Sequence, residues 1–190
     1  MNRRVLAITS IAVVVIIIAA AAIYLANARS GQLSNASQAP VNAPIAVGQT
    51  APEFSLPTTA GEFDLDKQTK PVFLEVFATW CPHCQHETAI LNPLYAAYGK
   101  RVAFIAIPGS TTGMDGSSAE SQFDIMNFQI RFSVKYPIAA YDPNLTVAKQ
   151  YLLGGYPTLV VINTDHKITF ATSGETPYAT LAAALNAALK

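Results

Sequence analysis

Apolar residues are distributed unevenly along this chain, and the longest uncharged stretch lies near its N-terminus. Residues 5–26 carry no charge and consist mainly of Val, Ile and Ala, which satisfies the requirement of about 20 apolar residues for a membrane-spanning helix. Residues 29–47 are rich in Ser, Asn, Gln, Ala and Pro without periodicity, a composition typical of a flexible tether. The pattern predicts an anchor over residues 1–28, a linker over 29–47 and a folded domain over 48–190.

The N-terminal apolar segment has a second interpretation, as a cleaved signal peptide, because Ala26–Ala28 has the small residues of a cleavage site. The apolar region of such signals is usually only about 7–15 residues long, so a retained single-pass anchor is favoured. Arg3 and Arg4 precede the segment, and only Arg29 follows it closely. The positive-inside rule then places the N-terminus in the cytoplasm and the folded domain in the periplasm or cell exterior.

The first half of the folded domain alternates between strand and helix patterns. Residues 71–78 and 101–108 are short apolar runs with branched and aromatic side chains, which predict two buried strands. Residues 86–99 between them predict a helix, which Pro93 should kink or break.

A second helix is predicted over residues 117–132. Ser118 is a possible N-cap, and Phe123, Met126 and Ile130 share one face at helical spacing.

The second half of the domain continues the alternation. Residues 136–142 predict a short strand and residues 143–153 a helix, while residues 176–190 predict a closing helix. Residues 158–163 and 167–172 predict two strands whose connection is too short for a crossover, so they should pair antiparallel. The pattern therefore predicts an α/β sandwich with a mixed central sheet.

Composition narrows the chemistry. The formal net charge is zero and only 13% of the residues are charged, so nothing indicates the basic surface of a nucleic-acid-binding protein. The chain has just two cysteines, Cys81 and Cys84. A disulfide between them would close too small a loop to stabilise the fold much, which leaves a redox pair, a metal site or a chance pair.

The position of the two cysteines favours the redox pair. Cys81 follows a predicted buried strand, and Pro82 suits the first turn of a helix because its missing N–H would have no partner there. The positive end of the helix dipole then stabilises a thiolate on Cys81, while Cys84, one turn inside, should be less exposed. Thiol–disulfide exchange needs one sulfur that attacks and a second that resolves the mixed disulfide. A Cys-x-x-Cys at the end of a strand in a βαβ-type pattern is a strong signal for this chemistry.

Three stretches carry a family resemblance: EVFATWCPHC (75–84), the preceding VGQTAPEFSLPTTAGEFDL (47–65) and the later GGYPTLVVINTDHKITF (154–170). They resemble the TlpA/ResA group of membrane-anchored thioredoxin-fold proteins, although the Pro-His dipeptide is similar to that of DsbA-type oxidases. The resemblance implies a thioredoxin-like sandwich, a central mixed sheet flanked by helices, with an N-terminal hairpin and an αβ insert at 108–142.

The resemblance also implies roles for individual residues. Cys81 would be the nucleophile, Cys84 the resolving cysteine and Pro157 a cis-proline that faces the disulfide. Tyr156 would then offer its backbone to an extended substrate as an added strand.

Glu75 is a further candidate for catalysis, and Pro82, His83 and Trp80 are candidates for tuning the site. Glu75 lies in an apolar strand where thioredoxin-like proteins place a buried acid; it would exchange protons with Cys84, unless the strand is an edge and Glu75 faces solvent. His83 would favour the Cys81 thiolate, or be a solvated side chain without a role. Trp80 would pack beside the disulfide, or be a plain core aromatic.

These features predict an extracytoplasmic thiol–disulfide oxidoreductase that acts on protein thiols or disulfides and exchanges electrons with a membrane partner. The direction of electron flow stays open, and we expect no cofactor or metal beyond the redox-active disulfide. The alternative is a thioredoxin-fold copper-binding chaperone, because Cys81 and Cys84 with His83 and His86 form a dense set of copper-type ligands. Such chaperones usually separate their cysteines by three residues, and here two intervene.

Overall fold

The structure is a computed structural model that describes residues 44–190. The strands are β1 (Ser55–Thr58), β2 (Gly61–Asp64), β3 (Val72–Phe77), β4 (Ala103–Pro108), β5 (Thr158–Ile162) and β6 (Ile168–Ser173). The helices are α2 (Pro82–Tyr98), α3 (Gln122–Arg131), α4 (Ala148–Tyr151) and α5 (Tyr178–Ala188). The expected anchor, and the linker up to residue 43, lie outside the described residues. Among residues 44–190 no helix has the length and hydrophobicity that crossing a bilayer requires.

The central sheet has the order β4-β3-β5-β6 and is mixed, as the sequence predicted. The pair β3–β4 is parallel, whereas β3–β5 and β5–β6 are antiparallel. The expected N-terminal hairpin is present as a separate two-stranded sheet of β1 and β2. This is the thioredoxin-like α/β sandwich that the sequence predicted.

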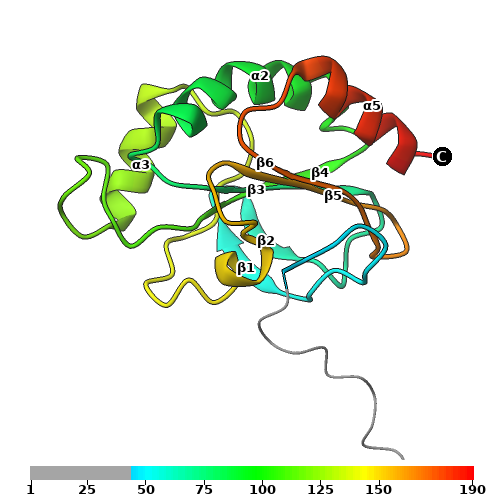
Figure 1. Cartoon of the computed structure of the whole chain (residues 1–190), viewed down its shortest axis with the longest axis horizontal. Helices are drawn as coiled ribbons and strands as arrows, with labels where there is room; N and C mark the ends of the chain where they lie inside the picture. Colours follow the sequence, from blue (N-terminus) through cyan, green and yellow to red (C-terminus); the bar gives the residue numbers. More distant parts are fainter. Residues whose placement is uncertain (1–43) are drawn as a thin grey trace, which may run out of the picture. The chain divides into compact units, whose positions relative to one another are not determined.

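Apolar side chains fill the space on both faces of the sheet. Helices α2, α3 and α5 cover one face, and the β1–β2 hairpin and α4 cover the other (Figure 1). Successive residues of a strand point to opposite faces, so Phe73 and Phe77 of β3 pack under the helices, while Leu74 and Val76 pack against the hairpin side. By the same alternation the Glu75 side chain lies on the helix side of the sheet.

Helix α2 is continuous through Pro93, so the expectation of a break was wrong. It begins at Pro82 and includes Cys84, as the placement of Pro82 in the first turn predicted, so it extends beyond the stretch 86–99 that the apolar pattern alone indicated. Pro93 and Ala89, whose carbonyl lost its donor to the proline, are both exposed, so water can satisfy that carbonyl. Leu91 and Leu94 on the opposite side are fully buried and hold both halves of the helix to the core.

Helix α3 has a different N-cap from the one predicted. Ser121 precedes the first turn, and its hydroxyl accepts a hydrogen bond from the N–H of Asp124 at 3.2 Å. Ser118 lies instead in a turn, where its N–H donates to the Asp115 carboxylate at 2.7 Å. Both serines precede an apolar pattern, and the sequence alone did not separate them.

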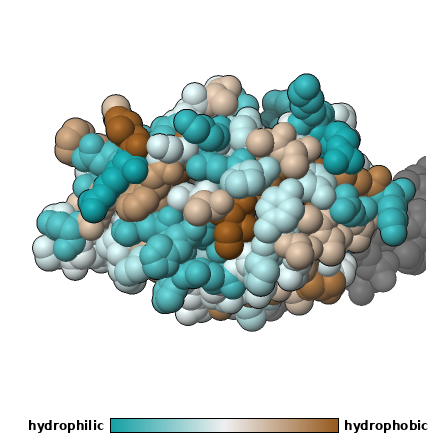
Figure 2. Space-filling view, turned by 90° about the horizontal axis from the view of Figure 1, so that it is seen from above, coloured by the Kyte–Doolittle hydropathy of each residue, from teal (hydrophilic) through white to brown (hydrophobic). Residues whose placement is uncertain are grey.

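The apolar face that helical spacing indicated for α3 is present, but it is not the face that packs. Phe123, Met126 and Ile130 are 68%, 50% and 74% exposed, and apolar surface gathers at the end of the molecule where α3 lies (Figure 2). The buried residues are Ile125 and Phe128, which share a second face at helical spacing. Helical periodicity identified two apolar stripes, and only the tertiary fold decides which one packs.

The segment between α3 and β5 is less regular than predicted. Residues 136–142 form no strand beyond two isolated bridges, in which Ile138 pairs with Ala106 and Ala139 with Thr58. The predicted helix over residues 143–153 is reduced to the single turn of α4.

The Asp142 side chain explains this irregularity. Its carboxylate accepts hydrogen bonds from the N–H groups of Asn144 and Thr146 at 2.8 and 2.7 Å, which fixes a turn in place of a helix. Leu145 within this turn has a positive φ of 53°, a conformation that no α-helix contains.

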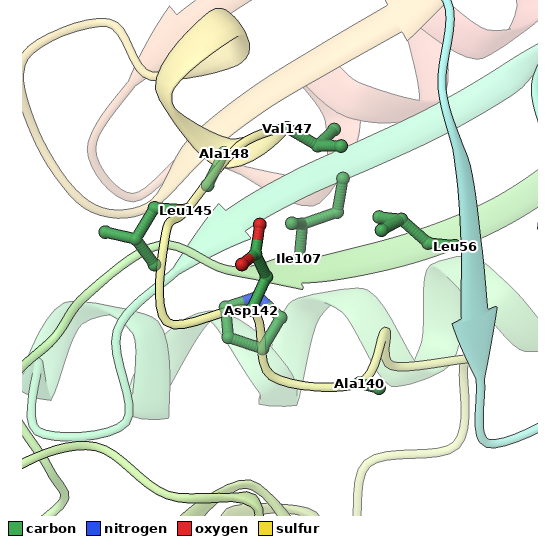
Figure 3. Close-up of a pocket in the computed structure, with 8 residues that line it drawn as sticks. Leu56, Ile107, Ala140, Asp142, Leu145, Val147 and Ala148 are labelled. Carbon is green, nitrogen blue, oxygen red and sulfur yellow. The ribbon is translucent and has the colours of Figure 1, made fainter.

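A small cavity lies beneath this turn, between β1, the end of β4 and residues 140–148 (Figure 3). Its volume of about 10 Å³ has room for about one water molecule. Asp142 lines it, but both carboxylate oxygens already bind the turn. The lining residues Ile107, Leu145 and Val147 belong to the core on the hairpin side of the sheet, and the cysteines belong to the core on the helix side.

Candidate active site

The two cysteines lie at the junction between the central strand β3 and helix α2. Cys81 is the N-cap residue of α2, with extended backbone angles (φ −78°, ψ 118°), and Pro82 is at the start of the helix. The Cys81 carbonyl accepts from the N–H of Gln85 at 3.1 Å, the first bond of the helix. This is the placement predicted from the sequence, with Cys81 at the positive end of the helix dipole.

Cys81 is more accessible than Cys84, but the difference is smaller than a position at the exposed end of a helix suggested. Both are free thiols, Cys81 is 5% exposed and Cys84 is fully buried. The expected order therefore holds, while Cys81 is more covered than an open helix end would be. Burial, followed by the nearby charge of Glu75, raises the pKa of the Cys84 thiol, so Cys84 stays protonated until a base takes its proton.

The segment before β5 faces Cys81. The Tyr156–Pro157 peptide bond is cis, as the family resemblance implied, and Pro157 is buried. The Cys81 Sγ lies 3.8 Å from the Tyr156 carbonyl oxygen, within reach of an S–H donor. Segments 75 residues apart in the chain therefore meet at the nucleophile candidate.

Two aromatic side chains form the rim beside Cys81, and the loop after β4 holds both. The Trp80 indole N–H donates to the Ser110 hydroxyl at 2.8 Å, and the Tyr156 hydroxyl donates to the Gly109 carbonyl. The rings meet edge to face, with centroids 6.1 Å apart. Trp80 is 37% exposed, so it is a surface residue of the site and no plain core aromatic.

The same loop ends at Glu120, a buried acid that sequence reasoning did not single out. Its Oε2 accepts from the Thr79 hydroxyl at 2.6 Å, and burial raises its pKa. Glu120 thus fixes the chain two residues before Cys81.

Glu75 lies under the helices in the middle of the sheet. It is 2% exposed and sits opposite Ala106 of β4 and Leu159 of β5, so the edge-strand interpretation is wrong. One oxygen accepts from the Tyr136 hydroxyl at 3.2 Å, and the other has no partner among residues 44–190. Burial, and then the charge of Glu87, raise the pKa of Glu75 to about 8.

Glu87 is a second buried acid near Cys84, and sequence reasoning missed it. It is fully buried on α2, accepts a hydrogen bond from the N–H of Thr176 at 3.1 Å, and burial raises its pKa to about 7. Its position could have been predicted, because Cys84, Glu87, Leu91 and Leu94 share one helical face. Two buried acids with pKa values of about 7 and 8 can therefore take up and release protons near Cys84 at neutral pH.

The histidines around the cysteines both turn to one carboxylate. The Nδ1 atoms of His83 and His86 lie 2.6 and 3.5 Å from the same oxygen of Glu175, and the hydrogen bond from His83 is the main reason why the pKa of Glu175 is lowered. Both histidine side chains are exposed. The structure thus gives His83 a partner that the sequence did not reveal.

The side chains that could hold a metal lie elsewhere. Among residues 44–190, the three-donor cluster within 4.8 Å consists of Glu53, Asp66 and His166. It lies at the turn between β5 and β6, where the Glu53–His166 contact of 3.0 Å raises the pKa of His166. In this part of the chain, no third donor joins Cys81 and Cys84 in such a cluster.

A Cys-x-x-Cys that caps the helix after the central strand and faces a cis-proline defines a thioredoxin-fold dithiol protein. Comparisons with known proteins agree. The Redoxin family model matches residues 46–187. A thiol-disulfide oxidoreductase ResA from Geobacillus thermodenitrificans is 33% identical over 65% of this chain and 67% of its own, and one from Bacillus cereus is 30% identical over 68% and 70%.

A solved structure gives the same result. The crystal structure of a thiol:disulfide interchange protein DsbE from Chlorobium tepidum is 26% identical, with a TM-score of 0.65 over 77% of this chain and 99% of its own. The chain belongs to the Redoxin family, and within it to the thiol–disulfide oxidoreductases.

Proposed function

We propose that this protein is a membrane-anchored, extracytoplasmic thiol–disulfide oxidoreductase that exchanges disulfides with protein substrates through Cys81 and Cys84. The observation that carries the proposal is the arrangement at the end of β3. Cys81 lies at a helix N-terminus, 3.8 Å from the Tyr156 carbonyl, and Cys84 is fully buried behind it.

In the reductive direction, the Cys81 thiolate attacks one sulfur of a substrate disulfide. A bond forms between Cys81 and that sulfur as the substrate disulfide breaks, and the other substrate sulfur leaves as a thiolate. Cys84 then loses its proton and attacks the sulfur of Cys81, and the Cys81–Cys84 disulfide forms as the bond from Cys81 to the substrate breaks and that substrate sulfur leaves as a thiolate. Two electrons pass to the substrate, and the reverse sequence oxidises a substrate dithiol.

Glu75 is the proposed proton acceptor for Cys84. It lies on the same side of the sheet as the cysteines, one of its oxygens is unpartnered in the described part of the chain, and its pKa of about 8 lies close to neutral pH. A group of such pKa can take up and release a proton during turnover.

The backbone of Tyr156 is the proposed docking strand. A substrate chain that lies along it would form main-chain hydrogen bonds as an added strand, with its cysteine beside Cys81. Trp80 and the Tyr156 ring would contact the residues that flank this cysteine.

The location and the membrane redox partner rest on the sequence. Residues 5–26 have the length and hydrophobicity of a membrane span, and Arg3 and Arg4 favour export of the domain. Protease added to intact cells or spheroplasts should degrade the domain, and a domain protected until lysis would contradict this topology.

Trapping of covalent intermediates tests the exchange reaction. Cys84→Ser should accumulate mixed disulfides with partner proteins, because the resolving thiol is missing, whereas Cys81→Ser and the double Ser variant should not. Adducts that form with Cys81→Ser in place of Cys84→Ser would reverse the assignment, and their absence from all three variants would refute the function.

A further inference from the structure

One short segment, residues 174–176 between β6 and α5, contacts three different parts of the site. The N–H of Gly174 donates to the Pro157 carbonyl at 2.8 Å. The Glu175 carboxylate binds His83 at 2.6 Å. The next residue uses its N–H to bind Glu87. The segment thus ties the cis-proline, the dipeptide between the cysteines and a buried acid to one another.

Glu175 is the charged member of this segment. Its oxygen lies between the Nδ1 atoms of His83 and His86, and its side chain is 38% exposed. The 2.6 Å contact commits Nδ1 of His83 to Glu175, while Cys81 Sγ faces the Tyr156 carbonyl. His83, which lies between the cysteines, is therefore paired with the Glu175 carboxylate and not with the sulfur of Cys81.

This pairing changes the electrostatic effect of His83. An isolated imidazolium beside Cys81 would stabilise the thiolate, hence the reduced form, and would make the disulfide a stronger oxidant. A carboxylate at hydrogen-bond distance cancels that charge, so the pair acts on Cys81 as a neutral unit with a much weaker field. Removing the carboxylate leaves the surroundings of Cys81 more positive.

We propose that Glu175 is a positioning residue that holds His83 and offsets its charge, so that the Cys81–Cys84 couple is less oxidising than its Pro-His dipeptide implies. The inference deepens the proposed function, on which it rests, and bears on the direction of electron flow. The reduction potential of the Cys81–Cys84 couple is then lower, closer to the reducing end of the range that thioredoxin-fold proteins cover.

The test is the equilibrium of the purified protein with glutathione at pH 7. Two glutathione thiols give up two electrons and two protons to the Cys81–Cys84 disulfide and form one glutathione disulfide. Glu175→Gln keeps the size of the side chain and removes its charge. Because exposed pairs interact weakly, we expect the equilibrium constant for reduction to rise about two- to fivefold, which is about 10–20 mV for a two-electron couple.

Glu53→Gln is the matched control, since Glu53 pairs with His166 at 3.0 Å at the other end of β5. It removes the same charge from a comparable Glu–His pair and should leave the equilibrium unchanged. The shift caused by Glu175→Gln should also shrink in about 1 M salt, where charges are screened beyond about 3 Å. An equal shift in both variants would indicate a general effect of net charge and would overturn the proposal.

Nuclear magnetic resonance of the His83 ring nitrogens provides a second readout. In the reduced parent protein Nδ1 should carry the proton that binds Glu175, and in Glu175→Gln the Nδ1-protonated fraction should fall. An unchanged ring signal and an unchanged glutathione equilibrium would refute the role of Glu175 alone. A parent protein without a reversible Cys81–Cys84 couple would refute the proposed function itself.

Discussion

The hydroxyl of Tyr136 donates a hydrogen bond of 3.2 Å to Glu75, from a position 61 residues farther along the chain. Tyr136 is itself buried, and burial together with Glu75 raises its pKa, so it remains a donor throughout the physiological range. The insert at 108–142 thus supplies the polar partner of the buried acid. This single bond opposes, but does not overcome, the burial that raises the pKa of Glu75.

Glu75→Gln should slow turnover without unfolding the domain, because Gln keeps the shape and can still accept from Tyr136. With a pKa of about 8, the carboxylate becomes available as a base as the pH rises from about 6 to 8. The parent rate of mixed-disulfide cleavage should rise over this range and the variant rate should rise less, with a difference of about 100-fold or less, at or below the low end of general base catalysis. Stopped-flow measurements across pH 6–9 would show this, and parallel profiles would leave Glu75 a structural acid.

Glu87→Gln should stabilise the reduced protein at alkaline pH. The folded state keeps Glu87 protonated up to a pKa of about 7, raised from 4.5. Between these values unfolding releases a proton, and the stability from this group, present below pH 4.5, is lost as the pH rises through 7. At pH 8 we expect the variant to gain about 2–4 kcal/mol relative to the parent, because the rise from 4.5 to about 7 corresponds to about 1.4 kcal/mol for each unit of pKa.

Urea unfolding at pH 5 and pH 8 measures this difference. Glu62→Gln, at an exposed position of β2, is the control and should behave alike at both values. A Glu87→Gln variant whose advantage is no larger at pH 8 than at pH 5 would contradict the raised pKa.

Substitutions on the two faces of α3 should differ in their effect on the free energy of unfolding. Ile130→Ser removes an exposed side chain at nearly constant helix propensity, so the free energy of unfolding should change by no more than about 0.5 kcal/mol. Phe128→Ala empties a buried site 4.8 Å from the Phe77 ring and should cost about 3–5 kcal/mol. Comparable losses for both variants, in urea unfolding, would mean that the exposed stripe is covered in solution.

The sequence predicted correctly those elements that depend only on neighbouring residues in the chain. The buried runs around Glu75 and Val160 identified β3 and β5, and Pro82 identified the start of a helix at Cys81. The arrangement of β5 and β6 followed from the shortness of their connection. The cis bond before Pro157 came from family resemblance, because the sequence alone favours trans.

The errors arose where two local solutions were equally good or where the partner is distant. Ser118 and Ser121 both suit an N-cap, and α3 has two apolar stripes. The Glu175–His83 contact joins residues 92 positions apart, and no periodicity reports such a pair. Glu87 was overlooked although its spacing from Cys84 was informative.

In the proposed exchange, the complete burial of Cys84 determines which of the two sulfurs an external thiol can attack. An external thiol that approaches the oxidised site can reach only the sulfur of Cys81, so each encounter has one covalent adduct as its outcome. The competing routes out of that adduct are attack by Cys84 from within and attack by a second external thiol. Because the internal thiol is permanently adjacent, partners are released by a first-order step that does not depend on their concentration.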